Sequence, residues 1–315
     1  MPQRLSMLNT IRGSQLERFY PRGWDLRAID RCCTFSLREL TTPSSHWHRN
    51  FKAIPVKSIA HPMGDAIADE IEQTRREKRE LAIILPVGPV NMYQTVVARL
   101  RRSGVCCDHV TTFNMDEWSD RSGNSMPGNQ PGGFEFTMNQ LLFDRLGRKT
   151  VPREQRNFAT KKNLPTYAGK ITALKKRGAK LVTVYGVGRT CHIAFWEPHL
   201  ADGMSQAHWK RQTHRVGVDL HPLTIEQNSL HSFNSRFTLI PCWANTIGPG
   251  LFLQSDWCIG AAEGAYPEYN AQWQGMSLCV TLKHKPTPWL PSTFMPTMAG
   301  RMFFTKPLAG PLLPV

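Results

Sequence analysis

The run Lys180-Leu181-Val182-Thr183-Val184-Tyr185-Gly186-Val187-Gly188-Arg189-Thr190-Cys191-His192-Ile193-Ala194-Phe195-Trp196-Glu197 carries the strongest structural signal in this chain. Its first six residues are mostly apolar and predict a buried strand. Gly186 and Gly188 then allow a tight turn with backbone N–H groups open to a ligand. A histidine and a carboxylate follow this turn. A strand that ends in this way is typical of a small-molecule site in an α/β protein.

The segments around this run alternate between short apolar strands and helical patterns. The sequence predicts strands at 81–85, 109–113, 181–185, 237–240, 257–259 and 277–282, and helices at 65–80, 92–102, 134–146 and 167–177. Such alternation favours parallel pairing with helical crossovers. We therefore expect a three-layer, Rossmann-like α/β fold with a mostly parallel sheet and helices on both faces.

The domain organisation follows from composition. Residues 1–50 are rich in arginine without a clear period, and we expect an N-terminal extension packed on the main domain. Residues 51–315 contain no convincing linker and are predicted to form a single α/β domain. The proline-rich segment 286–315 is expected to wrap around this domain.

Composition also excludes several classes of protein. No apolar run approaches the roughly 18 residues of a membrane helix, and the arginines near the start argue against a signal peptide. The eight cysteines lack metal-ligand spacing, so we expect no metal and a cytoplasmic location. The net charge of +15 favours anionic ligands, but the basic residues are dispersed, so we expect no nucleic-acid partner.

Candidate functional residues follow several of the predicted strands, in segments 86–91, 114–117, 186–197 and 242–250. The carboxyl ends of parallel strands share one edge of a sheet, where ligands bind. At this edge Asp116 is a candidate general base and His192 a candidate proton shuttle oriented by Glu197. The alternatives are a helix cap or exposed acid for Asp116 and a structural role for His192.

Cofactor sites are poorly supported. The turn at Gly88 precedes a predicted helix whose amides can hold an anion, but the segment lacks the Lys-Ser/Thr ending of an NTP-binding loop. No complete Gly-x-Gly-x-x-Gly is present, so a nicotinamide cofactor is not expected. His192 and Glu197 lack a third ligand for a metal.

At these residues the chain resembles the glucosamine-6-phosphate deaminase (isomerase) family. Thr112-Phe113-Asn114-Met115-Asp116-Glu117 matches the family's Thr-Phe-Asn-Met-Asp-Glu run. Gly186-Val187-Gly188, His192-Ile193-Ala194-Phe195 and Glu197-Pro198 match a second family motif, and Leu85-Pro86-Val87-Gly88 resembles the phosphate-side turn more loosely. The similarity covers about residues 60–285.

The resemblance implies aldose–ketose isomerisation of an amino sugar phosphate with loss of ammonia, without metal or cofactor. In that scheme His192 helps to open the sugar ring, Glu197 tunes it, and Asp116 carries a proton between carbon 2 and carbon 1. The partner is then a small sugar or sugar phosphate, and a homo-oligomer is possible. The expected substrate-binding residues are Gly88, Glu117, Gly186, Gly188, Arg189, Thr190 and Thr246.

Two departures from the family pattern leave the substrate open. Thr190 stands where the family has an acidic residue. The family's phosphate-binding arginine and lysine are missing, and their positions fall near Leu220 and Glu263. Other candidates for holding a phosphate are Arg189, Arg215, His208, His214 and the amides after Gly88. The alternatives are another amino sugar as substrate, a sugar-lactone hydrolase of the same fold, and a catalytically reduced sugar-sensing protein.

Overall fold

The central feature is a seven-stranded sheet in a computed structural model that describes residues 11, 13–266, 268 and 271–312. Its order is β1-β12-β9-β6-β2-β3-β5, and every neighbouring pair of strands is parallel. The strands are β1 (Phe51–Val56), β2 (Leu81–Leu85), β3 (Val110–Asn114), β5 (Arg156–Asn157), β6 (Lys180–Gly186), β9 (Trp257–Ala262) and β12 (Gly300–Thr305).

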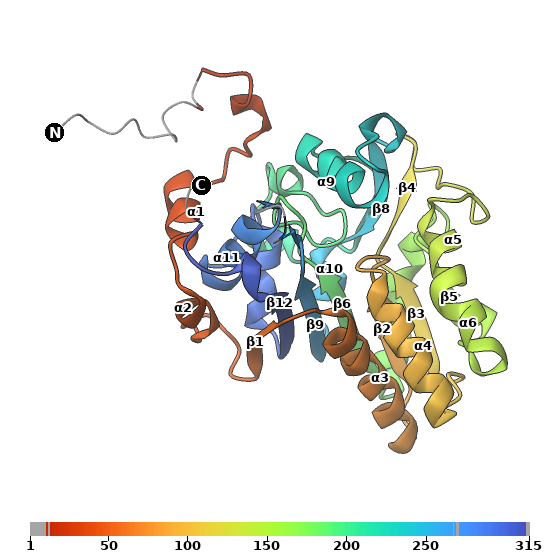
Figure 1. Cartoon of the computed structure of the whole chain (residues 1–315). Coiled ribbons are helices and arrows are strands. Elements are labelled where there is room, and N and C mark those ends of the chain that lie inside the picture. Colours follow the sequence, from red (N-terminus) through yellow and green to blue (C-terminus); the bar gives the residue numbers. More distant parts are fainter. Residues whose placement is uncertain (1–10, 12, 267, 269–270, 313–315) are drawn as a thin grey trace.

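Helices cover both faces of this sheet, as Figure 1 shows. One face carries α3 (Ala60–Arg76), α4 (Asn91–Ser103), α5 (Phe134–Met138) and α6 (Asp144–Leu146). The other carries α1 (Leu26–Cys32), α2 (Leu37–Thr41), α7 (Tyr167–Lys176), α10 (Pro249–Phe252) and α11 (Gly275–Lys283). The expected three-layer α/β fold is therefore confirmed.

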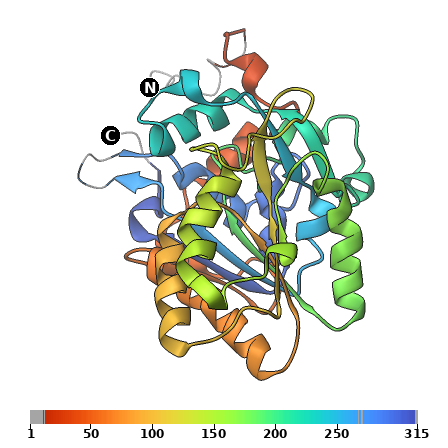
Figure 2. The same cartoon turned by 90° about the vertical axis from the view of Figure 1, so that its right-hand side faces the viewer.

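A smaller antiparallel sheet adjoins one end of the large sheet (Figures 1 and 2). Its order is β4 (Asp116–Ser119), β8 (Trp243–Ile247) and β7 (His214–Asp219). α8 (Gln206–Trp209) precedes β7, α9 (Pro222–Ser232) follows it, and β10 (Ala265–Tyr266) pairs with β11 (Ala271–Gln272). Only Met115 separates β3 from β4, so the chain passes directly from one sheet to the other.

The strands predicted at 81–85, 109–113, 181–185 and 257–259 are confirmed as β2, β3, β6 and β9. All five residues of β2 are buried, because helices cover both faces of a parallel sheet and no polar alternation is needed. The helices predicted at 65–80, 92–102 and 167–177 correspond to α3, α4 and α7. Segment 134–146 is helical throughout, but α5 and α6 are joined by a π-helical turn at Asn139–Phe143.

Two strand predictions are wrong. Residues 277–282 lie in helix α11, and residues 237–239 form a short 3-10 helix. The α11 run Ser277–Leu282 is buried on every side, so it shows no amphipathic period and cannot be distinguished from a buried strand by pattern.

The C-terminal segment does more than wrap the domain. Strand β12 enters the interior of the large sheet and pairs with β1 on one side and β9 on the other. Near the N-terminus, α1 contacts α11, and α2 contacts both α11 and β1. A domain division at residue 50 stays a prediction. Among the helices of the described residues, none combines the length and apolar character of a membrane span.

Candidate active site

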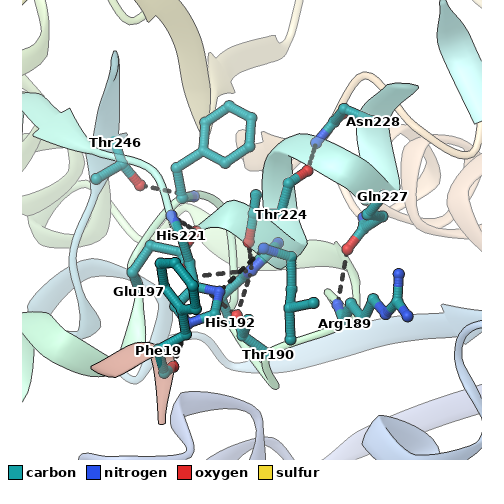
Figure 3. A network of polar contacts seen from close by, with 12 residues as sticks. Phe19, Arg189, Thr190, His192, Glu197, His221, Thr224, Gln227, Asn228 and Thr246 are labelled. Atoms are coloured by element: carbon teal, nitrogen blue, oxygen red, sulfur yellow. Dashed lines mark hydrogen bonds and ion pairs between the residues drawn. The ribbon is translucent and has the colours of Figure 1, made fainter. Parts of the chain in front are cut away.

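A hydrogen-bonded cluster lies in the loop that follows β6. The Thr190 Oγ1 atom is 2.9 Å from His192 Nδ1 and also 2.9 Å from Glu197 Oε2 (Figure 3). The direct distance between His192 Nδ1 and Glu197 Oε2 is 3.4 Å. Thr190 and Glu197 are fully buried and His192 is 5% exposed, so solvent weakens these contacts little. The loop therefore brings together the histidine and carboxylate that the sequence analysis paired.

The backbone of this loop explains its glycine at position 188. The Gly188 N–H donates to the His192 carbonyl, and the Cys191 N–H donates to the Gly188 carbonyl. A Cβ at position 188 would lie 1.9 Å from His192 Nε2, so only glycine lets the imidazole occupy its place. At Gly186 the nearest atom to a Cβ is the Gly88 carbonyl oxygen at 3.9 Å. The turns after β2 and β6 thus lie side by side.

Glu197 is held as a carboxylate. Burial by itself raises its pKa, but the charge of His192 and hydrogen bonds from His192 and Thr224 outweigh burial and lower the pKa to about 2. The backbone N–H of His221 donates to Glu197 Oε1 at 3.2 Å. Its two oxygens therefore accept from two different elements.

Helix α9 supplies contacts that the sequence analysis missed. Thr224 Oγ1 lies 3.2 Å from His192 Nδ1. His221 caps this helix by accepting from the Leu223 N–H, and its Nε2 donates to the Phe19 carbonyl at 2.6 Å. No local motif marks these residues, because their partners lie 24 to 202 positions away in the chain.

Asp116 opens β4 and is linked to the same loop through β8. Asp116 pairs in register with Thr246, whose Oγ1 accepts from the Phe195 N–H at 3.0 Å. The Phe195 ring in turn lies 6.2 Å from the His192 ring, between centroids. Asp116 is 7% exposed, and burial, followed by the charge of Glu117, raises its pKa well above the ordinary range. Asp116 and His192 therefore border one region at the carboxyl edge of the large sheet.

Glu117 has a different position from the one expected for a substrate ligand. Its Oε1 accepts from the N–H groups of Trp118 and Phe134, and its Oε2 accepts from the N–H of Glu135. Burial raises its pKa to about 7, although these three amides favour the charged form. Because its oxygens are occupied by the start of α5, we assign Glu117 to positioning that helix.

The candidate anion-binding residues are only partly available. The Arg189 guanidinium pairs with Glu226, and its backbone N–H donates to Gln227 Oε1 at 2.7 Å. Arg215 and His208 are exposed, and the Arg215 guanidinium lies 6.0 Å from the centroid of the Trp196 ring. Of the other candidates, His214 is half-buried and Gly88 is exposed just before α4. At the two positions where the family's phosphate ligands are replaced, Leu220 is buried and Glu263 is half-buried. Among the described residues, no three His, Cys, Asp or Glu side chains are arranged to hold a metal.

The chain is similar in sequence to proteins named glucosamine-6-phosphate deaminase. It is 30% identical over 189 residues to the protein of that name from Pectobacterium carotovorum, and this match covers 57% of this chain and 62% of the relative. It is 28% identical over 207 residues to that of Tolumonas auensis, covering 63% and 70%. The match therefore spans less than two thirds of the first relative's length. No family model matches the chain.

Solved structures share the fold. A monomeric glucosamine-6-phosphate deaminase superimposes with a TM-score of 0.64 at 16% identity, over 82% of this chain and 98% of that one. A 6-phosphogluconolactonase from Trypanosoma cruzi gives 0.53 at 18% identity, over 84% and 98%. The chain is thus similar in sequence to glucosamine-6-phosphate deaminases and shares its α/β fold with a solved deaminase and a solved 6-phosphogluconolactonase.

Proposed function

We propose that this protein is an enzyme that converts an amino sugar phosphate, with glucosamine-6-phosphate as the first candidate, into a ketose phosphate and ammonia. The observation that carries the proposal is the link between Asp116 and the Thr190–His192–Glu197 cluster through Thr246 and Phe195. The linkage sets a carboxyl group and an imidazole at the same edge of the sheet. The sequence relatives named above support the same reaction.

The chemistry requires proton transfers that these groups can perform. His192 opens the pyranose ring by moving a proton between the ring oxygen and the anomeric hydroxyl, and Glu197 stabilises the imidazolium form. Asp116 then removes the proton from carbon 2 and returns it to carbon 1 through an enolamine. Water adds to carbon 2 of the resulting imine, and ammonia leaves to give the ketose. Burial raises the Asp116 pKa, which suits a group that must hold and release a proton.

The phosphate end of the substrate is less well provided for. The turn at Gly88 lies beside Gly186 and precedes α4, whose first amides point out of the helix and favour an anion. Arg189 contributes a positive charge only if it leaves Glu226. We therefore propose the amides after Gly88 as the main phosphate contact. The cytoplasmic location and a homo-oligomeric state stay predictions.

The test is an assay of ammonia release and ketose formation over a panel of amino sugars, each with and without phosphate. We expect turnover of a phosphorylated amino sugar by the wild type and none by Asp116→Asn. Hydrolysis of a phosphogluconolactone without ammonia release would favour the lactone hydrolase. Sugar binding without any turnover would favour the sensing protein, and either result would overturn the proposed function.

A further inference from the structure

Two threonine hydroxyls surround one nitrogen of His192. Thr190 Oγ1 lies 2.9 Å from Nδ1, Thr224 Oγ1 lies 3.2 Å from it, and Glu197 Oε2 lies 3.4 Å away (Figure 3). Thr190 comes from the loop after β6 and Thr224 from α9, so two separate elements enclose the same side of the ring. Both threonines are fully buried.

The hydrogen positions follow from a count of donors. The Glu197 carboxylate can only accept, so the Thr190 hydroxyl donates to Glu197 Oε2. A hydroxyl carries a single hydrogen, and Thr190 can therefore only accept from His192. The hydrogen between Thr190 Oγ1 and His192 Nδ1 must then belong to Nδ1. In the neutral imidazole this leaves Nε2 as the unprotonated nitrogen.

We infer that Thr190 and Thr224 are positioning residues that hold His192 in its Nδ1–H tautomer, and that Thr190 relays the negative charge of Glu197 to the imidazole. The inference concerns the site of the proposed function and gives its histidine a defined protonation state. The ring is packed against Gly188, where a Cβ would lie 1.9 Å from Nε2. In this tautomer Nε2 is the only imidazole nitrogen that can accept a proton from a substrate.

Each threonine has a separate part in this arrangement. Thr190 bridges histidine and carboxylate, so removing its hydroxyl interrupts the charge relay and takes away one of the donors to the buried Glu197 carboxylate. Thr224 lies farther from the imidazole nitrogen, at 3.2 Å against 2.9 Å for Thr190, and it also hydrogen-bonds to Glu197, so its removal loosens the ring but leaves the shorter Thr190 bridge in place. We therefore expect a larger effect at position 190 than at position 224.

The test uses the full chain labelled with ¹⁵N in its eleven histidines. Long-range proton–nitrogen correlation spectra distinguish the two tautomers, and the His192 signals are identified by their absence in His192→Gln. We expect wild-type His192 to be protonated at Nδ1 when neutral. Thr190→Val should shift it toward the Nε2–H form, and Thr190→Ser should restore the wild-type pattern because the hydroxyl is kept.

Kinetics give a second readout once a substrate is known. Thr190→Val should lower kcat by roughly 10²-fold, the scale of a misplaced catalytic group. The KM should stay unchanged, and the pH profile should move with the imidazole. Thr183→Val is the matched control, because Thr183 is fully buried on β6 but bonds to Ser255 rather than to the site.

Two results would overturn the inference. One is a wild-type His192 protonated at Nε2 in its neutral form. The other is a His192 tautomer that stays the same as in the wild type in both single variants, Thr190→Val and Thr224→Val. The spectra require no turnover, so failure of the proposed reaction would leave this test intact. If Thr190→Val does not fold, the wild-type spectrum still decides between the tautomers, and Thr224→Val still tests the second threonine.

Discussion

Replacing Gly188 with alanine tests the placement of His192 directly. A Cβ at position 188 would lie 1.9 Å from Nε2, 2.1 Å from Cε1 and 2.2 Å from Cδ2 of the imidazole. Non-bonded carbon atoms in contact lie about 3.5–4.0 Å apart, so the ring must move by roughly 1.5 Å or more. A shift of that size disrupts the 2.9 Å contact between Nδ1 and Thr190 Oγ1.

The expected magnitude combines two effects. Overpacking a buried site costs about 1–3 kcal/mol of unfolding free energy. Misplacing a catalytic group by about 1 Å costs roughly 10²-fold in rate. We therefore expect Gly188→Ala to lose both stability and turnover on these scales. Urea unfolding measures the first, and ammonia release from the substrate measures the second.

Gly186→Ala is the control for stability. The added Cβ would meet only the Gly88 carbonyl oxygen at 3.9 Å, an ordinary contact. Its unfolding free energy should stay within about 0.5 kcal/mol of the wild type. The reasoning is refuted if Gly188→Ala is as stable as Gly186→Ala and leaves the His192 imidazole signals unshifted. Equal destabilisation by both variants would also refute it.

Three further predictions concern buried charges and the N-terminal contact. Burial and the Glu117 charge raise the Asp116 pKa, so the folded state keeps a proton that the unfolded state releases above about pH 4. Asp116→Asn should abolish turnover, and its unfolding free energy in urea should rise relative to that of the wild type as the pH increases. A difference in unfolding free energy that does not change with pH would contradict this. The Glu197 pKa is lowered from 4.5 to about 2, so its charge stabilises the fold above pH 4.5 and this contribution disappears as pH falls through 2. Glu197→Gln should lose about 3–5 kcal/mol near pH 7 in thermal or urea unfolding, with the deficit shrinking in acid, whereas a constant deficit would argue against a charged Glu197. His221→Ala removes the 2.6 Å hydrogen bond to the Phe19 carbonyl, so amide hydrogen exchange around residues 17–24 should accelerate about fivefold, as for a loss of ~1 kcal/mol. Replacing the exposed His208 with alanine is the control and should leave the exchange rates unchanged. Identical exchange rates in both variants would show that the bond does not hold this segment.

The central strands could be predicted because their signal is local. β2 and β6 are short, mostly apolar runs bounded by a charged residue on one side and by proline or glycine on the other, and their burial on both faces makes the run nearly continuous. Helix α11 was missed for the same reason, since a helix buried all round also reads as a continuous apolar run. β12 was missed because its pairing with β1 and β9 depends on partners far away in the chain. The prolines on either side of it also led us to expect a wrapping segment and no strand.

The candidate site divides in the same way. The sequence by itself determined which groups could carry the chemistry, because Asp116, His192 and Glu197 follow strands whose carboxyl ends share one edge. It also determined that Glu117 is an acid beside Asp116, but only the tertiary structure showed its oxygens occupied by the amides that start α5.

Tertiary structure alone decided how the histidine is held. Thr224 and the His221 N–H reach His192 and Glu197 from α9, and Thr246 reaches the same loop from an antiparallel sheet. Hydrogen bonds act over about 3 Å and carry no trace in the spacing of residues along the chain. The sequence therefore determined the reactive groups and their strands, whereas the folded structure determined their hydrogen-bond partners and protonation, because both depend on contacts between distant segments.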